Sequence, residues 1–93
     1  MVTSSFNRLE NRILLKNKLS EKGFSVRFHG YEYYIIGKKF VSIVLLAPNF
    51  NRIFIHKIGW NPAESEAAVK EIYSLVKEID PLAEIILDGD KET

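Results

Sequence analysis

The two histidines, His29 and His56, are the side chains of this chain best suited to bind a transition metal or to move a proton near neutral pH. Both fall in predicted strands, at positions from which they could face the same side of a sheet. A zinc site needs further ligands, yet the sequence contains no cysteine and no acidic residue at matching spacing. We therefore expect no metal site and no cofactor.

Covalent catalysis finds no support in the sequence either. No serine or threonine has a candidate base and an orienting acid around it. The five glycines are isolated, each at the boundary of a predicted element, so they form no glycine-rich phosphate loop. We expect neither an enzyme nor a small-molecule substrate.

Basic side chains are the remaining groups that could bind a ligand, and they are unevenly distributed. Residues 1–60 contain ten lysines and arginines against three glutamates, whereas residues 61–93 contain three lysines against nine acidic residues. This division is typical of a nucleic-acid-binding half with an acidic counterweight, but it also fits an acidic, solvated helix and tail. The candidate nucleic-acid-binding residues are Arg8, Arg12, Lys16, Arg27, Lys38, Lys39, Arg52 and Lys57.

Composition limits the architecture to one small domain. The chain has 93 residues, of which 46% are hydrophobic and 27% charged, with a net charge of +1. We expect a single α/β domain over residues 1–93, with an ordered core over about residues 6–88 and a polar tail over residues 89–93. The longest uncharged apolar run is far shorter than the ~20 residues that cross a bilayer, and no signal peptide is evident. We expect a cytoplasmic protein without a membrane partner, since the lack of cysteine is compatible with a reducing interior.

Hydrophobic periodicity predicts the order helix, four strands, helix, strand. The first helix is expected to begin near Ser5 or Asn7, which are good N-caps, and to end at Gly23. Its predicted apolar face consists of Phe6, Leu9, Ile13, Leu15 and Leu19. The predicted strands are residues 24–29, 31–36, 40–46, 52–58 and 82–87. The second helix is expected to begin at Pro62, after the N-cap Asn61, and to end before Pro81.

The strand over residues 40–46 is apolar on both faces, which predicts a place in the middle of the sheet. Val41, Ile43 and Leu45 alternate with residues of the opposite face, including Val44 and Leu46. Two helices that cover one face each would give three layers, whereas two helices on the same face would leave the other for a partner. Phe50 and Trp60, in or beside loops, are the candidate residues of a dimer interface.

Several phrases in this order resemble the archaeal Holliday-junction resolvases of the PD-(D/E)XK nuclease superfamily. They are a basic helix ending in Glu21–Phe24, then Val26-Arg27, Gly30, the hairpin Gly37–Phe40, and a strand like Arg52–Ile55 before the last helix and strand. The likeness spans roughly residues 7–88. It implies a restriction-endonuclease-like topology, with a mixed sheet flanked by helices, and a dimer.

The catalytic residues of that family are missing here. In the family, an aspartate, a glutamate and a lysine hold magnesium and orient the attacking water. The aspartate position falls at about Tyr34, beside Glu32, while the glutamate and lysine positions fall at Val44 and Leu46. The resemblance thus implies a nuclease skeleton that does not cleave DNA. Arg12, nearest the family's helix acid, could point toward the lost metal position or snorkel from the helix.

Two functions remain open from the sequence. The first is a catalytically inactive nuclease-fold protein that binds duplex or branched DNA through the basic helix and the strand edges. The alternative is a homodimeric protein-interaction or regulatory module with no role in nucleic-acid binding. Its basic half would then contact an acidic partner or the second subunit.

Overall fold

The computed structural model describes residues 5–38, 40–59 and 62–89. Their elements are η1 (Ser5–Asn7), α1 (Leu9–Glu21), β1 (Ser25–His29), β2 (Glu32–Ile36), β3 (Phe40–Ala47), η2 (Pro48–Phe50), β4 (Arg52–Gly59), α2 (Pro62–Ile79) and β5 (Glu84–Gly89). The predicted order of one helix, four strands, a second helix and a last strand is therefore confirmed. Residues 90–93 of the predicted tail lie outside the described residues.

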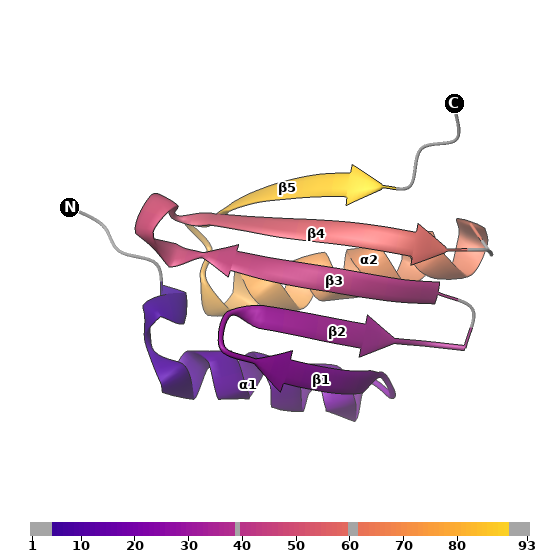
Figure 1. The fold of residues 1–93 in the computed structure, drawn as a ribbon, viewed down its shortest axis with the longest axis horizontal. Helices are drawn as coiled ribbons and strands as arrows, with labels where there is room; N and C mark the ends of the chain where they lie inside the picture. Colours follow the sequence, from indigo (N-terminus) through magenta and orange to yellow (C-terminus); the bar gives the residue numbers. More distant parts are fainter. Residues whose placement is uncertain (1–4, 39, 60–61, 90–93) are drawn as a thin grey trace.

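The five strands form one mixed sheet in which they lie in chain order (Figure 1). β1 to β4 pair antiparallel, and β5 pairs parallel to β4 after the chain crosses over through α2. The predicted α/β class is confirmed, and β3 lies at the centre of the sheet as its apolar sequence indicates. The restriction-endonuclease-like topology remains a prediction.

Both helices cover the same face of the sheet, so the fold has two layers (Figure 1). Lys18 and Lys22 of α1 form ion pairs with Glu78 and Glu71 of α2, at 3.4 and 3.3 Å, which shows that the helices lie side by side. Their buried side chains meet one set of alternate strand residues, including Tyr33 and Ile55. Of the two arrangements open from the sequence, the one that leaves a sheet face without a helix is observed.

The end of α1 matches the sequence prediction, but its start and its buried face do not. Gly23 has a φ of 97°, and the Phe24 N–H donates to the Leu19 carbonyl at 3.3 Å, which makes a Schellman end. The N-cap residue is Arg8, without a side-chain cap, rather than Ser5 or Asn7. Of the predicted apolar face, Phe6, Leu15 and Leu19 are buried, while Leu9 and Ile13 are exposed. The prediction was wrong at Leu9 and Ile13 because the helix turns the side of Leu15 and Leu19 toward the sheet.

The second helix has the predicted bounds, and one of its faces is buried. Ala68, Ile72, Leu75 and Val76 lie in the core, as the 3.6-residue period requires. β5 begins two residues later than predicted, since a turn ends in the hydrogen bond from the Ala83 N–H to the Asp80 carbonyl. Within the described residues, no helix is long and apolar enough to span a membrane.

Candidate functional site

The sheet face opposite the helices, called the open face here, is covered by none of the described elements (Figure 1). Strand alternation sets its membership, because the residues next to the buried ones along each strand must point the other way. On β2, for example, Tyr33 and Ile35 are fully buried, whereas Tyr34 and Ile36 are 37% and 40% exposed. The described side chains of the open face are Ser25, Arg27, His29, Glu32, Tyr34, Ile36, Val41, Ile43, Leu45, Ala47, Arg52, Phe54, His56, Glu84 and Ile86.

Apolar side chains occupy the centre of the open face. Leu45, Phe54 and Ile86 are cross-strand neighbours on β3, β4 and β5, and Ile36 lies opposite Val41. We call Ile36, Val41, Ile43, Leu45, Phe54 and Ile86 the apolar patch. A contiguous apolar area of this kind on a monomer is characteristic of a surface that binds another molecule.

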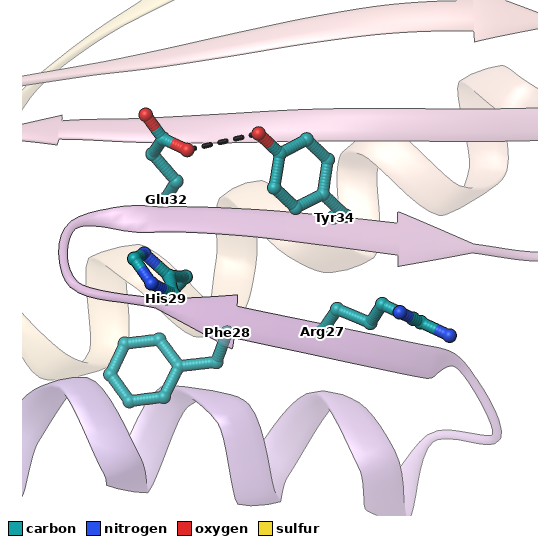
Figure 2. Close-up of a pocket in the computed structure, with 5 residues that line it drawn as sticks. All are labelled: Arg27, Phe28, His29, Glu32 and Tyr34. Atoms are coloured by element: carbon teal, nitrogen blue, oxygen red, sulfur yellow. Dashed lines mark hydrogen bonds between the residues drawn. The ribbon is translucent and has the colours of Figure 1, made fainter.

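Polar side chains flank the apolar patch on its β1 and β2 side (Figure 2). Arg27, Phe28, His29, Glu32 and Tyr34 line a shallow depression of about 600 Å³. The Tyr34 hydroxyl donates to Oε1 of Glu32 at 2.9 Å, and this hydrogen bond, with the charge of Glu32, raises the pKa of Tyr34. Phe28 belongs to the opposite face, where its ring stacks on Tyr33 at 4.9 Å. The depression thus offers hydrogen bonds and charges of both signs.

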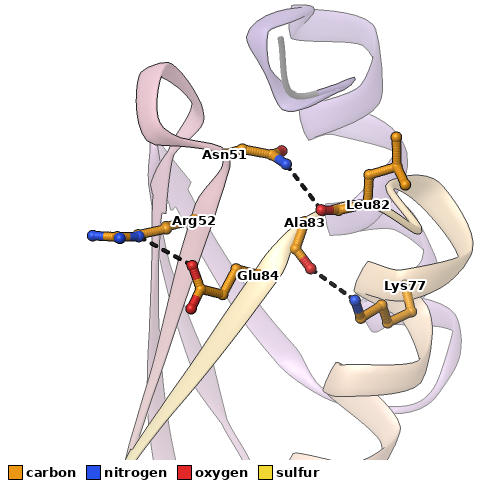
Figure 3. Close-up of polar contacts among 6 residues, drawn as sticks. All are labelled: Asn51, Arg52, Lys77, Leu82, Ala83 and Glu84. Atoms are coloured by element: carbon orange, nitrogen blue, oxygen red, sulfur yellow. Dashed lines mark hydrogen bonds and ion pairs between the residues drawn. The ribbon is translucent and has the colours of Figure 1, made fainter. Parts of the chain in front are cut away.

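A second polar margin lies at the start of β4 and β5 (Figure 3). Nε of Arg52 contacts Oε1 of Glu84 at 3.2 Å across the parallel pair. Behind it, Asn51 Nδ2 donates to the Leu82 carbonyl at 2.9 Å, and Lys77 Nζ donates to the Ala83 carbonyl at 2.7 Å. These bonds fix the loop that leads from α2 into β5.

The predicted nucleic-acid-binding residues do not gather on one surface. Arg27 and Arg52 are on the open face but three strands apart, and Arg52 is paired with Glu84. Lys57 belongs to the helix-covered face, because it lies two residues after the buried Ile55 on the same strand. The remaining candidates lie elsewhere: Arg8 beside Glu10 at 3.2 Å, Arg12 and Lys16 on α1, and Lys38 after β2, while Lys39 lies outside the described residues.

Arg12 is held by the turn between β1 and β2. Its guanidinium carbon lies 4.2 Å from the centre of the Tyr31 ring, and Nη1 donates to the Gly30 carbonyl at 3.2 Å. Gly30 has a φ of 62°, a conformation that favours glycine. Of the two roles left open by the sequence, the contact with Tyr31 and Gly30 matches a helix arginine whose head reaches out to a neighbouring surface.

The positions at which the resemblance would put a nuclease metal site lie on opposite faces of the sheet. Val44 and Leu46 are buried under the helices, whereas Tyr34 and Glu32 lie on the open face. Side chains on opposite faces of a strand pair cannot converge on one cation. If Tyr34 occupies the position of the metal-binding aspartate, positions 34, 44 and 46 therefore cannot form one metal site.

The two histidines share the open face, as their strand positions predicted, but they lie on β1 and β4. Three strand spacings alone separate their backbones by about 14 Å, and an offset of two residues along the strands adds to this, which is too far for one metal ion. Among the described residues, no group of three or more His, Cys, Asp or Glu side chains is placed to hold a metal.

The predicted interface residues are placed as follows. Phe50 is 73% exposed in η2, at the end of the molecule rather than on the open face, and Trp60 lies outside the described residues. Sequence reasoning did not single out Ile36, Phe54 and Ile86. The signal that would have found them is the alternation of side chains along a strand. Since Ile53 and Ile55 are buried under the helices, Phe54 between them must point to the open face.

No family model, curated protein or solved structure matches this chain.

Proposed function

We propose that this protein is a homodimeric interaction module whose contact surface is the open face of its sheet. The supporting observation is that both helices cover one face while the other carries the apolar patch at its centre. A layer of sheet with one apolar face uncovered gains free energy when a second surface removes that face from water. A cytoplasmic location is part of this proposal.

Oligomeric state is the test of this function. The variant Leu45→Glu places a charge in the apolar patch, at a residue that is 41% exposed in the monomer. The control Lys70→Glu reverses a charge on the exposed side of α2, away from the sheet. We expect sedimentation velocity and light scattering to give a dimer for the wild type and for Lys70→Glu, and a monomer for Leu45→Glu. A wild type that stays monomeric at millimolar concentration, or a Leu45→Glu variant that dimerises normally, would refute the proposal.

A second candidate function is DNA binding through α1 and the β1 edge, as the nuclease resemblance implies. It is favoured by Lys16 on α1 and Arg27 on β1, two elements that pack against each other. Lys18 and Lys22, by contrast, are paired with acids of α2. Because α1 lies on the helix-covered side and Arg27 on the open face, a DNA that contacted both would have to pass along the β1 edge, where cations can bind phosphates without reading sequence.

Salt-dependent titration tests this second function. A labelled four-way junction and a duplex are titrated at increasing salt concentration with the wild type, with Arg27→Glu and with Arg52→Glu as the matched control. If Arg27 contacts a phosphate, Arg27→Glu weakens binding on both DNAs and lowers the salt slope by about one. Arg52→Glu should weaken DNA binding less than Arg27→Glu does, because Arg52 is already paired with Glu84. Affinity that is undetectable at low salt, or that shows no salt slope, would exclude this function.

A further inference from the structure

Ile43 lies at the centre of the open face. β3 is the third of five strands, and Ile43 lies between Val41 and Leu45 among the β3 residues on that face. Its cross-strand neighbours are Tyr34 and His56. A two-fold axis that passes between two copies of this face through their centres brings each Ile43 against the partner's Ile43.

The open face has the area of a small specific interface. Five strands at a spacing of ~4.8 Å and five residues at a rise of ~3.4 Å cover roughly 400 Å² in projection. The accessible surface of the face is larger than this projected area, because the side chains project from the sheet. Specific interfaces start near ~600 Å² of accessible surface per partner, so a face-to-face dimer belongs to the small, reversible class.

The charges on the open face suit a second copy of the same chain. Its described charged side chains are Arg27 and Arg52 with Glu32 and Glu84, two of each sign. The described charges of two such faces therefore balance, and they give no net repulsion when the faces approach. A polyanion such as DNA would instead require an excess of positive charge on the surface that it contacts.

Arg27 restricts how two copies can meet. It is the middle residue of β1, an edge strand, so antiparallel pairing of two β1 edges centred there would put Arg27 opposite the partner's Arg27. A face-to-face dimer whose two-fold axis runs across the strands would bring the same two arginines together. Like charges directly opposite one another are destabilising, and a charged edge strand resists pairing.

We infer that two copies pack face to face with the two-fold axis along β3, so that Ile43 contacts the partner's Ile43 and the β1 side of each copy covers the β5 side of the other. This inference rests on the proposed function, because it requires a dimer. It keeps the Arg27 side chains of the two copies apart and buries both apolar patches. The result is a four-layer particle with the helices on the outside.

Single-cysteine cross-linking tests this arrangement, since the natural chain contains no cysteine. The variants are Ile43→Cys at the expected axis, Arg27→Cys on β1 and Lys70→Cys on the exposed side of α2. Each is treated with a short bifunctional maleimide at a concentration where sedimentation shows the dimer. Packed sheets lie ~10 Å apart, within reach of such a reagent when both cysteines point into the interface. We expect most of Ile43→Cys, and almost none of Arg27→Cys or Lys70→Cys, to become covalent dimer.

The other outcomes distinguish a dimer with a different arrangement from the absence of a dimer. Cross-linking of Arg27→Cys without Ile43→Cys would identify β1 edge pairing and overturn the inference. Cross-linking of both would place the axis across the strands and overturn its direction. A dimer that cross-links at neither position would use a different surface. A monomeric wild type would instead refute the proposed function itself.

Discussion

The guanidinium carbon of Arg12 lies over the ring of Tyr31, 4.2 Å from its centre, and this contact joins α1 to the turn between β1 and β2. The contact spans 19 residues of sequence, and it is reinforced by the hydrogen bond from Nη1 to the Gly30 carbonyl at 3.2 Å. A cation over an aromatic face contributes roughly 0.5–2 kcal/mol, depending on solvent exposure. Arg12 therefore has a structural role that its place among the basic residues of α1 does not reveal.

Replacement of Arg12 should lower stability even in the absence of any ligand. We expect Arg12→Ala to reduce the free energy of unfolding by about 1–2 kcal/mol, because it removes the ring contact and the bond to Gly30 together. Arg12→Lys should recover only part of the loss, since an ammonium group lacks the planar stacking surface. Urea denaturation measures both. Lys16→Ala, one turn further along α1, is the control, and equal losses at the two positions would contradict a specific role for Arg12.

Tyr33 gives the protein a characteristic alkaline instability. Its side chain is fully buried, its hydroxyl donates to the Arg12 carbonyl at 2.7 Å, and burial raises its pKa well above the ordinary 10.0, although the charge of Arg12 opposes the shift. The neutral form is therefore favoured in the folded state. This preference contributes fully to the free energy of unfolding below pH 10. Above pH 10 the free energy of unfolding falls by up to about 1.4 kcal/mol per pH unit, because Tyr33 ionises more readily in the unfolded chain.

The variant Tyr33→Phe isolates this effect. Near neutral pH it should be less stable than the wild type by about 1 kcal/mol, the usual net value of one hydrogen bond. Above pH 10 the difference should shrink and then reverse, because phenylalanine has no proton to lose on unfolding. Denaturation of both proteins between pH 8 and pH 11 provides the comparison. Parallel stability curves across this range would show that Tyr33 is not shielded from solvent.

The sequence predicted the elements well because their signals are local. Gly23 ends α1 in a left-handed conformation, as a glycine after a helix predicts. The start of α2 at Pro62 follows from the preference of proline for the first helical position, and the burial of Ile72 follows from the helical period of the apolar residues. The face that α1 buries was less predictable, since Leu9, Ile13 and Leu15 are equally apolar and only tertiary packing chooses among them. The same limit applied to the open face, because no local signal says on which side of a sheet two separate helices will pack.

Asn51 combines two features that can be separated by substitution. It has a left-handed backbone, with φ 55° and ψ 38°, and its Nδ2 donates to the Leu82 carbonyl at 2.9 Å. Asn51→Gly keeps the backbone conformation at no steric cost and loses only the side-chain bond. Asn51→Ala loses the bond and also strains the backbone by about 1 kcal/mol. We expect thermal denaturation to rank stability as wild type, then Asn51→Gly, then Asn51→Ala, and an alanine variant equal to or above glycine would refute this account.

Ile43 and Val44 are adjacent on β3, yet a lysine should have opposite consequences at the two positions. Val44 is fully buried under the helices, so Val44→Lys places an unpaired charge in the core and should cost more than about 4 kcal/mol, enough to unfold a domain of this size. Ile43 faces the open side, where a lysine can extend into water, so Ile43→Lys should leave a folded monomer. Circular dichroism and sedimentation of the two variants distinguish these outcomes. If Ile43→Lys also unfolds the monomer, the open face is part of the core rather than a surface for a second copy.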